Sequence, residues 1–235
     1  LIDVEDLNSY TQEVVTLNFV KDTYDNLKAI DNIDSNLVTM ADAALQVTDV
    51  VDLSKINDLR SITTSNITLN LLADSKENLG IIDDFKIEQG VNGPINGDVI
   101  LSNTDITVTN VVNKEEADII NGYNDVSGTV TLTSVTDILE NVNALSTTDG
   151  ISISTSDLKV TDVTTLSDAQ DLDGYTTGEV TLDVVTDSFL NVQSIHDLTP
   201  AEDGADGVDL TAALITITDP VSLTQAETAN GFSDG

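Results

Sequence analysis

The sequence contains no cysteine and one histidine, and aromatic residues make up 3% of the chain. The absence of cysteine excludes disulfide bonds and thiolate metal sites. One histidine, His196, offers little from which to build a Ser-His-Asp triad or a histidine metal site, so we interpret it as incidental. Because aromatics are scarce, the core must be built from Val, Ile, Leu and Ala.

Positive charge is also scarce, with 8 Lys and Arg against 42 Asp and Glu and a formal net charge of −34. A chain of this charge is a poor partner for nucleic acid or an anionic membrane surface, since binding there needs the opposite sign. No apolar run approaches the ~20 residues of a membrane span. The charge suits a chain that lives among cations, either dissolved salt or bound Ca²⁺.

A short phrase is repeated along the chain. "VTLDVVTDSFLNV" begins at residue 180, and related phrases begin at residues 15, 67 and 130. A second phrase, as in "LQVTDVVDLSKINDL", begins at residues 45, 106, 158 and 215. Both phrases predict a short strand, then Asp or Asn, then a short helical or irregular stretch. A third element at 96–102, 149–154 and 206–210 opens with an Asn-Gly or Asp-Gly turn signal before a short strand.

Each predicted strand alternates with a period of two, so that Val180, Leu182 and Val184 point to one side and Thr181 and Asp183 to the other. The residues that correspond to the first set, and that we expect in the core, are Val15, Leu17, Phe19, Ile67, Leu69, Leu71, Val130 and Leu132. This pattern predicts an α/β fold, a repeat solenoid of stacked parallel short strands with short helices or 3₁₀ turns on the return side. An all-β solenoid is the alternative.

The repeats divide the chain into 1–44, 45–105, 106–157 and 158–213, with a partial repeat at 214–235. We expect a single solenoid of about four two-phrase repeats that starts and ends mid-repeat. Uncapped solenoid ends expose strand edges and core surface, which favour pairing. The expected partners are copies of the chain, joined end to end, or flanking repeats of a longer chain.

Asp or Asn recurs where each predicted strand ends, and we expect these side chains to cap the helices that follow. They are Asp22, Asp74, Asp137 and Asp187 in the first phrase and Asp49, Asn110, Asp162 and Asp219 in the second. An asparagine follows each first-phrase Asp by four residues. These asparagines, Asn26, Asn78, Asn141 and Asn191, predict a structural ladder of buried amides that serve unpaired backbone groups.

Calcium is the ligand that the acidic loops favour. "AEDGADGVD" places Asp203, Asp206 and Asp209 three residues apart with glycines between them, so a tight loop can aim three carboxylates at one hard cation. "DLDG", with Asp171 and Asp173, is a second candidate. Neither segment matches an EF-hand loop, and solvated turn residues are the alternative interpretation.

No catalytic motif is present: the sequence has no Walker loop, no G-x-G-x-x-G and no G-x-S-x-G. An acidic solenoid that degrades polysaccharides is the enzyme alternative, but such enzymes need basic residues near the sugar acid and this chain has one arginine, Arg60. The pairs Thr107/Thr109, Thr131/Thr133 and Thr216/Thr218 leave open a fibre, such as a phage fibre, that binds glycan or ice.

The pairing of "DGYTTGEVTL" with "VVTDSFLNV" resembles the tandem repeats of long, Asp- and Thr-rich surface proteins of cyanobacteria and proteobacteria. The resemblance implies secretion, a structural or adhesive role and often Ca²⁺, and it carries over no catalytic residue. We therefore predict a non-enzymatic, extracellular structural protein, part of a surface filament, sheath or adhesin stalk. Its self-assembly, head to tail, is part of this hypothesis.

Overall fold

A computed structural model of the chain describes residues 13–33, 37–85, 98–125, 127–198 and 207–233. By its internal contacts the chain divides into two units. Unit 1 comprises residues 1–107 and 120–129, and unit 2 comprises residues 108–119 and 130–235. The first division, after residue 107, falls close to the boundary predicted between the repeats 45–105 and 106–157.

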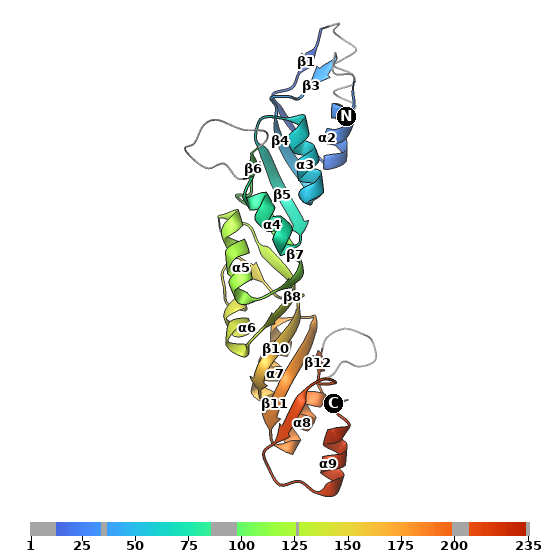
Figure 1. Ribbon diagram of the computed structural model, residues 1–235, viewed down its shortest axis with the longest axis vertical. Coiled ribbons are helices and arrows are strands. Elements are labelled where there is room, and N and C mark those ends of the chain that lie inside the picture. The colour runs from blue at the N-terminus through green and yellow to red at the C-terminus, as the bar shows by residue number, and fades with distance from the viewer. Residues whose placement is uncertain (1–12, 34–36, 86–97, 126, 199–206, 234–235) are drawn as a thin grey trace. The chain divides into compact units, whose positions relative to one another are not determined.

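Unit 1 alternates parallel strands with helices (Figure 1). Its elements are β1 (Val15–Thr16), β2 (Phe19–Asp22), α2 (Tyr24–Asp31), β3 (Val38–Thr39), β4 (Ala44–Val51), α3 (Leu53–Ile62), β5 (Ile67–Asp74), α4 (Lys76–Asp83) and β6 (Val99–Ile100). Two further elements cross the divisions between the units: β7 (Asp105–Val112) and α5 (Lys114–Asn121). The 3₁₀ helix η1 (Gly122–Asn124) directly follows α5 and belongs to unit 1.

Unit 2 repeats the same alternation. Its elements are β8 (Val130–Asp137), α6 (Leu139–Leu145), β9 (Ile151–Ser152), β10 (Asp157–Thr164), α7 (Leu166–Tyr175), β11 (Glu179–Asp187), α8 (Phe189–His196), β12 (Gly207–Asp209), β13 (Leu214–Ile217) and α9 (Leu223–Asn230). The strand–helix alternation confirms the predicted α/β class, and the all-β alternative is wrong.

Strand pairing is parallel and keeps one register in both units. In unit 1, Leu45 of β4 lies opposite Ile67 of β5, and Val47 lies opposite Leu69. In unit 2 the corresponding pairs are Leu158 with Val180 and Val160 with Leu182. All eight side chains are buried. Equivalent phrases therefore form equivalent strand pairs, as the alternation of apolar and polar residues predicts.

The weak third element forms a short strand in each repeat, including the N-terminal repeat, where the sequence signal is degenerate. These strands, β3, β6, β9 and β12, pair with the start of the preceding first-phrase strand. A tight turn follows each of them, closed for example by the Ser156 N–H donating to the Ile153 carbonyl at 3.1 Å. The following second-phrase strand then pairs with the rest of the same first-phrase strand, as Val184 does with Leu214.

A β-bulge corrects the prediction of which side chains enter the core. Between Val47 and Val50 of β4, two residues lie opposite the single residue Asn70 of β5. Beyond this point Leu72 is buried and Leu71 is not, although period two predicts the reverse. The change of face falls in β5, opposite the bulge, since the buried residues Leu45, Val47 and Val51 of β4 keep the period of two. Unit 2 has the same bulge in β10, and there Val185 is buried in place of the expected Val184.

The first strands of unit 1 depart furthest from the expected core. Phe19 is 61% exposed, and Val15 and Leu17 are half-buried. Their counterparts Val180 and Leu182 are buried because β10 covers them on one edge and β12 lies on the other. Val15 and Phe19 have described partners on one edge alone, in β3 and β4.

Candidate functional site

Each first-phrase aspartate is the last residue of its strand, and one of its oxygens organises the start of the following helix. Oδ1 of Asp187 accepts the Ser188 backbone N–H at 2.7 Å and the Asn191 side-chain amide at 2.8 Å. The same two bonds recur at Asp22, Asp74 and Asp137. The fixed Asp and Asn of the phrase are therefore partners of each other.

This geometry corrects the expected N-caps. The N-cap residues are Thr23, Ser75 and Ser188, each one residue after the aspartate, and their hydroxyls accept the backbone N–H of Asn26, Asn78 and Asn191. In α6 the N-cap is Ile138, whose side chain cannot accept a hydrogen bond. The aspartate is still extended strand, so its carboxylate bonds to the N-cap amide from one residue upstream. The Ser or Thr after three of the four aspartates is the signal that would have identified the cap.

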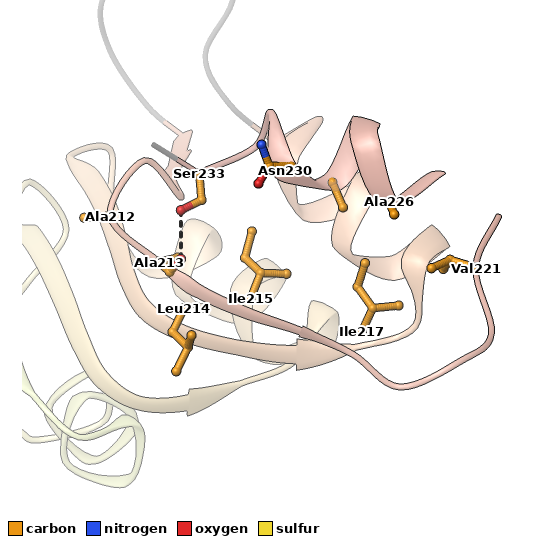
Figure 2. A pocket seen from close by; sticks show the side chains of 10 residues that line it. Ala212, Ala213, Leu214, Ile215, Ile217, Val221, Ala226, Asn230 and Ser233 are labelled. Atoms are coloured by element: carbon orange, nitrogen blue, oxygen red, sulfur yellow. Dashed lines mark hydrogen bonds between the residues drawn. The ribbon is translucent and has the colours of Figure 1, made fainter. Parts of the chain in front are cut away.

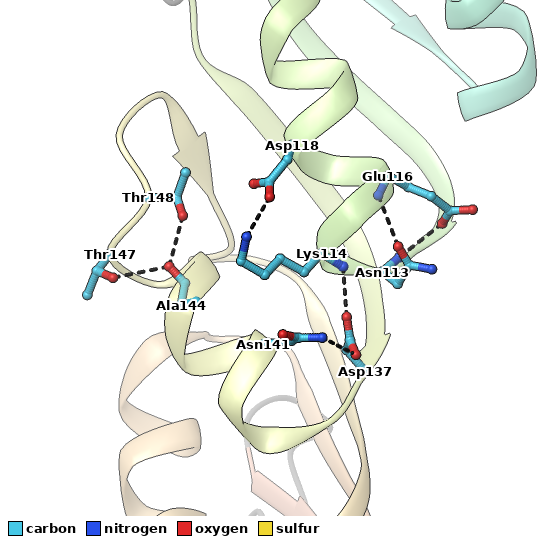
Figure 3. A network of polar contacts seen from close by, with 9 residues as sticks. All are labelled: Asn113, Lys114, Glu116, Asp118, Asp137, Asn141, Ala144, Thr147 and Thr148. Carbon is cyan, nitrogen blue, oxygen red and sulfur yellow. Dashed lines mark hydrogen bonds and ion pairs between the residues drawn. The ribbon is translucent and has the colours of Figure 1, made fainter.

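The second oxygen of the carboxylate reaches the helix of the preceding phrase. Oδ2 of Asp187 accepts the N–H of Leu166, the first residue of α7, at 3.0 Å. Oδ2 of Asp74 accepts the N–H of Leu53 at 2.8 Å. In Figure 3, Asp137 lies between the Lys114 N–H, at 2.8 Å from Oδ2, and the Asn141 amide. The first N–H groups of a helix have no partner within the helix, so each carboxylate satisfies a donor that would otherwise be unpaired.

The second-phrase aspartates bond in the same way to the first N–H of the helix that follows the neighbouring first-phrase strand. Asp49, Asp162 and Asp219 accept the N–H of Tyr24, Leu139 and Phe189 at 2.8, 2.7 and 2.8 Å. They therefore contact helices α2, α6 and α8, each of which follows the neighbouring strand.

Asp49, Asn110 and Asp162 were expected at strand ends and instead lie inside β4, β7 and β10. Asp219 lies two residues beyond β13. The strands continue past Asp49 and Asp162 because the bulge accommodates one extra residue at each. The N-caps of the helices that follow are Asp52, Thr165 and Ser222, three residues further on.

The hydrogen bonds to the first-phrase aspartates lower the pKa of three of them, Asp22, Asp137 and Asp187. The amide of Asn26 is the main cause that holds the pKa of Asp22 below its ordinary value. Burial raises the pKa of Asp187, but hydrogen bonds from Leu166, Ser188 and Asn191 together outweigh it and lower the pKa. Asp137 follows the same pattern. Hydrogen bonds to the charged form favour that form, so these aspartates are bound as carboxylates.

The predicted asparagine ladder has a different partner from the one expected. Asn26, Asn78, Asn141 and Asn191 are half-buried, and their side-chain amides donate to the aspartate four residues earlier. The side chain that reaches backbone groups of the neighbouring helix is the aspartate, because it is charged and stands at the strand end. A charged acceptor makes a stronger bond to an amide N–H than a neutral one.

A set of polar residues that sequence reasoning missed joins the turns to the following phrase. The Thr63 hydroxyl donates to the Ala43 carbonyl at 2.6 Å, and the Thr176 hydroxyl donates to the Ser156 carbonyl at 2.6 Å. Asn124 donates from its side chain to the Thr104 carbonyl in the same way. Ser233 bonds to Ala213. The signal was a Thr, Asn or Ser within three residues of the end of each second-phrase helix, which is hard to distinguish from an ordinary loop residue.

The calcium candidates are not brought together by the described structure. Asp203 and Asp206 lie outside the described residues, and Asp209 accepts the Thr211 N–H at 2.8 Å. Asp171 and Asp173 were expected in a turn and instead lie in α7, two residues apart, so they point to different sides of the helix. In the described ranges, no three His, Asp or Glu side chains form a group that could hold a metal ion. Calcium binding stays a prediction.

His196, Tyr24 and Arg60 make contacts with neighbouring rings and carboxylates. The His196 ring lies 4.3 Å from the Phe232 ring, centroid to centroid. The Tyr24 hydroxyl donates to Asp58 at 2.7 Å, and this bond raises the pKa of Tyr24 to about 12. The Arg60 guanidinium stacks 3.7 Å from the Phe85 ring. Each contact positions a side chain between neighbouring elements.

Comparison of the chain with protein-family models, with curated proteins and with solved structures finds no match. None of the helices in the described ranges combines the length and the apolar composition that crossing a membrane requires. The site is therefore defined by its geometry: a recurrent set of carboxylates, each bonded to the start of its own helix or of a neighbouring one.

Proposed function

We propose that the chain is a non-enzymatic structural protein of the cell surface, a segment of a filament, sheath or adhesin stalk built as a repeat solenoid. The observation that supports this most directly is the bridging aspartate. Asp74, Asp137 and Asp187 each bond to their own helix and to the N–H that begins the preceding helix. A repeated bridge of this kind serves cohesion between successive coils.

The bridge joins hydrogen bonding to the burial of the apolar core. At the β10–β11 pair, Leu158 and Val160 are buried beside Val180 and Leu182, while Asp187 ties α7 to the same coil. Separating the two coils would break the strand pairing, expose apolar surface and leave the Leu166 N–H without its acceptor. In a solenoid, stability is shared between neighbouring repeats in this way.

The charge also fits a surface role. A formal net charge of −34 makes lateral contacts between chains repulsive, which keeps extended structures separate in solution. It also attracts cations, so the calcium proposal belongs to the same function. Strands and helices would supply the cohesion along the chain, and the acidic exterior would prevent clumping.

Immunogold electron microscopy with an antibody to the purified chain tests this proposal on intact cells of the source organism. We expect label on the surface of unpermeabilised cells, and on filaments or a sheath where these are present. A strain in which the gene is deleted is the matched control. Label that appears only after permeabilisation would overturn the surface role, and release of reducing ends from an acidic polysaccharide by the purified chain would overturn the non-enzymatic one.

A further inference from the structure

One hollow on the surface of unit 2 has a mostly aliphatic lining. It has a volume of about 530 Å³ and lies between β13 and α9, where Ile215 faces Ala226 (Figure 2). The corresponding residues of the preceding coil, Leu158 and Ala169, are buried in the core. The lining of this hollow therefore has the composition of a protein core, which does not select a small polar ligand.

A smaller pocket at the end of α7 has an uncharged, polar lining built around one aromatic ring. Its volume is about 300 Å³. The lining consists of Ser146, Ser152, Ser154, Gly174, Tyr175 and two isoleucines. It contains no Asp, Glu, Lys, Arg or His, although 21% of the chain is charged. This volume lies at the lower end of the range for small-molecule sites, so the pocket suits a ligand of about one ring.

Hydrogen bonds hold the walls of this pocket in place. Ser146 is the C-cap of α6, and its hydroxyl donates to the Asn143 carbonyl at 2.8 Å. The turn after β9 is tied to the segment after α7, because the Thr177 N–H donates to the Ser154 carbonyl at 2.9 Å. A ligand would thus meet walls that are already ordered, which lowers the cost of binding.

The next coil shows what the place beside the ring can hold. Phe232 corresponds to Tyr175, and His196 corresponds to Ser146. The His196 ring stacks on Phe232, with 4.3 Å between the ring centroids. Ser146 has no ring to stack, and within the described residues no ring or cation stacks on Tyr175. The pocket therefore lies at the position that an imidazole occupies in the next coil.

In unit 1 the equivalent position is charged. There Tyr123 corresponds to Tyr175, and Asp83 corresponds to Ser146. Burial raises the pKa of Tyr123, and the charges of Asp83 and Asp84 raise it further, so these carboxylates act on the Tyr123 hydroxyl. Of the three rings at this position in the described chain, Tyr175 is the one whose neighbour is small and neutral.

We infer that the Tyr175 pocket binds a neutral sugar, with one pyranose ring stacked on the tyrosine. The face of an aromatic ring is electron-rich and attracts the C–H groups on one face of a pyranose. The hydroxyl oxygens of Ser152 and Ser154 lie 3.1 Å apart and bond to each other, which leaves one hydroxyl hydrogen and lone pairs on both for a ligand. Groups that both donate and accept match the hydroxyls of a sugar, which do the same.

Charge favours a neutral sugar over an acidic one. Proteins hold a carboxylate with Arg or Lys, and the lining of this pocket contains neither. The formal net charge of −34 also repels an anionic ligand. Sugar binding here goes beyond the proposed structural function and does not depend on it.

Saturation-transfer NMR on the full chain tests this site. The probes are D-glucose, D-galactose, D-mannose and N-acetyl-D-glucosamine, with D-glucuronate as the acidic comparison. At least one neutral sugar should show transfer, with a Kd of about 1–10 mM, and D-glucuronate should bind more weakly. The absence of transfer to every neutral sugar, or binding of D-glucuronate as tight as that of the best neutral sugar, overturns the inference.

Variants at the pocket test its position. Ser146→His copies the next coil and fills the space beside the ring, while Tyr175→Ile removes the ring and inserts the residue that α3 has there, Ile62. Each should weaken sugar binding about 10-fold or more, and circular dichroism should show that each is folded. Tyr175→Phe keeps the ring and is the matched control, with an affinity within about threefold of wild type.

Equal sugar binding by all four proteins would place the sugar elsewhere and overturn this site. Surface labelling of cells together with no sugar binding would leave the proposed function standing and refute the pocket alone.

Discussion

A single aspartate side chain in this protein accepts three hydrogen bonds from two helices. Asp187 accepts the Ser188 N–H and the Asn191 amide with one oxygen and the Leu166 N–H with the other. Asparagine has the same shape but only one acceptor oxygen, and its amide would meet N–H donors. The position therefore requires a carboxylate, and a charged one.

We expect Asp187→Asn to lower the free energy of unfolding by about 1–3 kcal/mol at pH 7. In the folded protein the pKa of Asp187 lies below 3.8, so its contribution is complete above that pH and is lost as the pH falls through the folded pKa. Urea unfolding of both proteins between pH 2 and pH 7 measures this. Their stabilities should converge in acid.

Asp171→Asn is the matched control for this change. Asp171 is exposed on α7, and its replacement should alter stability by less than about 0.5 kcal/mol. An equal loss in the two variants would show that removal of one negative charge, rather than loss of the bridge, is responsible.

At the scale of the element, the close approach of turns to strand starts depends on two glycines. A Cβ at Gly178 would lie 2.3 Å from the Ser156 carbonyl oxygen, and a Cβ at Gly128 would lie 2.0 Å from the Thr104 oxygen. Both obstacles are backbone atoms, which cannot rotate away. Glycine is thus required at these two turns, whereas the equivalent turn after α3 has Ser65, whose N–H bonds to the Thr63 hydroxyl as that of Gly178 bonds to Thr176.

Gly178→Ala and Gly174→Ala form a pair with opposite expected results. The first should lower stability by about 1–3 kcal/mol, because the Ser156 turn must shift. The second lies inside α7 with no atom within 4 Å of the added Cβ, and should raise stability by about 0.5–1 kcal/mol through helix propensity. Thermal and urea unfolding measure both, and a neutral Gly178→Ala would contradict the close contact.

Much of the element order could be predicted from the sequence, because alternation and turn signals are local. The face of each strand beyond the bulge could not, since a bulge depends on how two strands pair. One repeat nevertheless indicated the change of face. Where the others have Leu71 or Val184, β8 has the polar Ser134, followed by the buried Val135. The role of the fixed aspartate was partly predictable, but its bond to the preceding helix depends on the three-dimensional neighbourhood.

At the scale of the whole molecule, charge dominates the dependence on solution conditions. With a net charge of −34, like charges repel throughout the chain, and folding brings them closer together. The screening length falls from roughly 30 Å at 0.01 M salt to roughly 3 Å at 1 M. Salt should therefore relieve this repulsion.

We expect the melting temperature to rise steadily with NaCl between 0.01 M and 1 M, as measured by circular dichroism. CaCl₂ at equal ionic strength is the companion series: stabilisation beyond that given by NaCl would support the proposed calcium binding, and coincident curves would count against it. A melting temperature that falls or stays constant with NaCl would contradict the dominance of repulsion.

The bridging aspartate also constrains how such a chain can change in length. Because its two oxygens serve helices of successive phrases, removal of one phrase leaves a helix start without its acceptor and brings two unlike strands into contact. Removal of a complete pair of phrases leaves every helix start with its acceptor and every strand next to a strand of the other phrase. Gene duplication and deletion would thus be tolerated only in whole two-phrase steps, and the lengths of natural variants should be quantised accordingly.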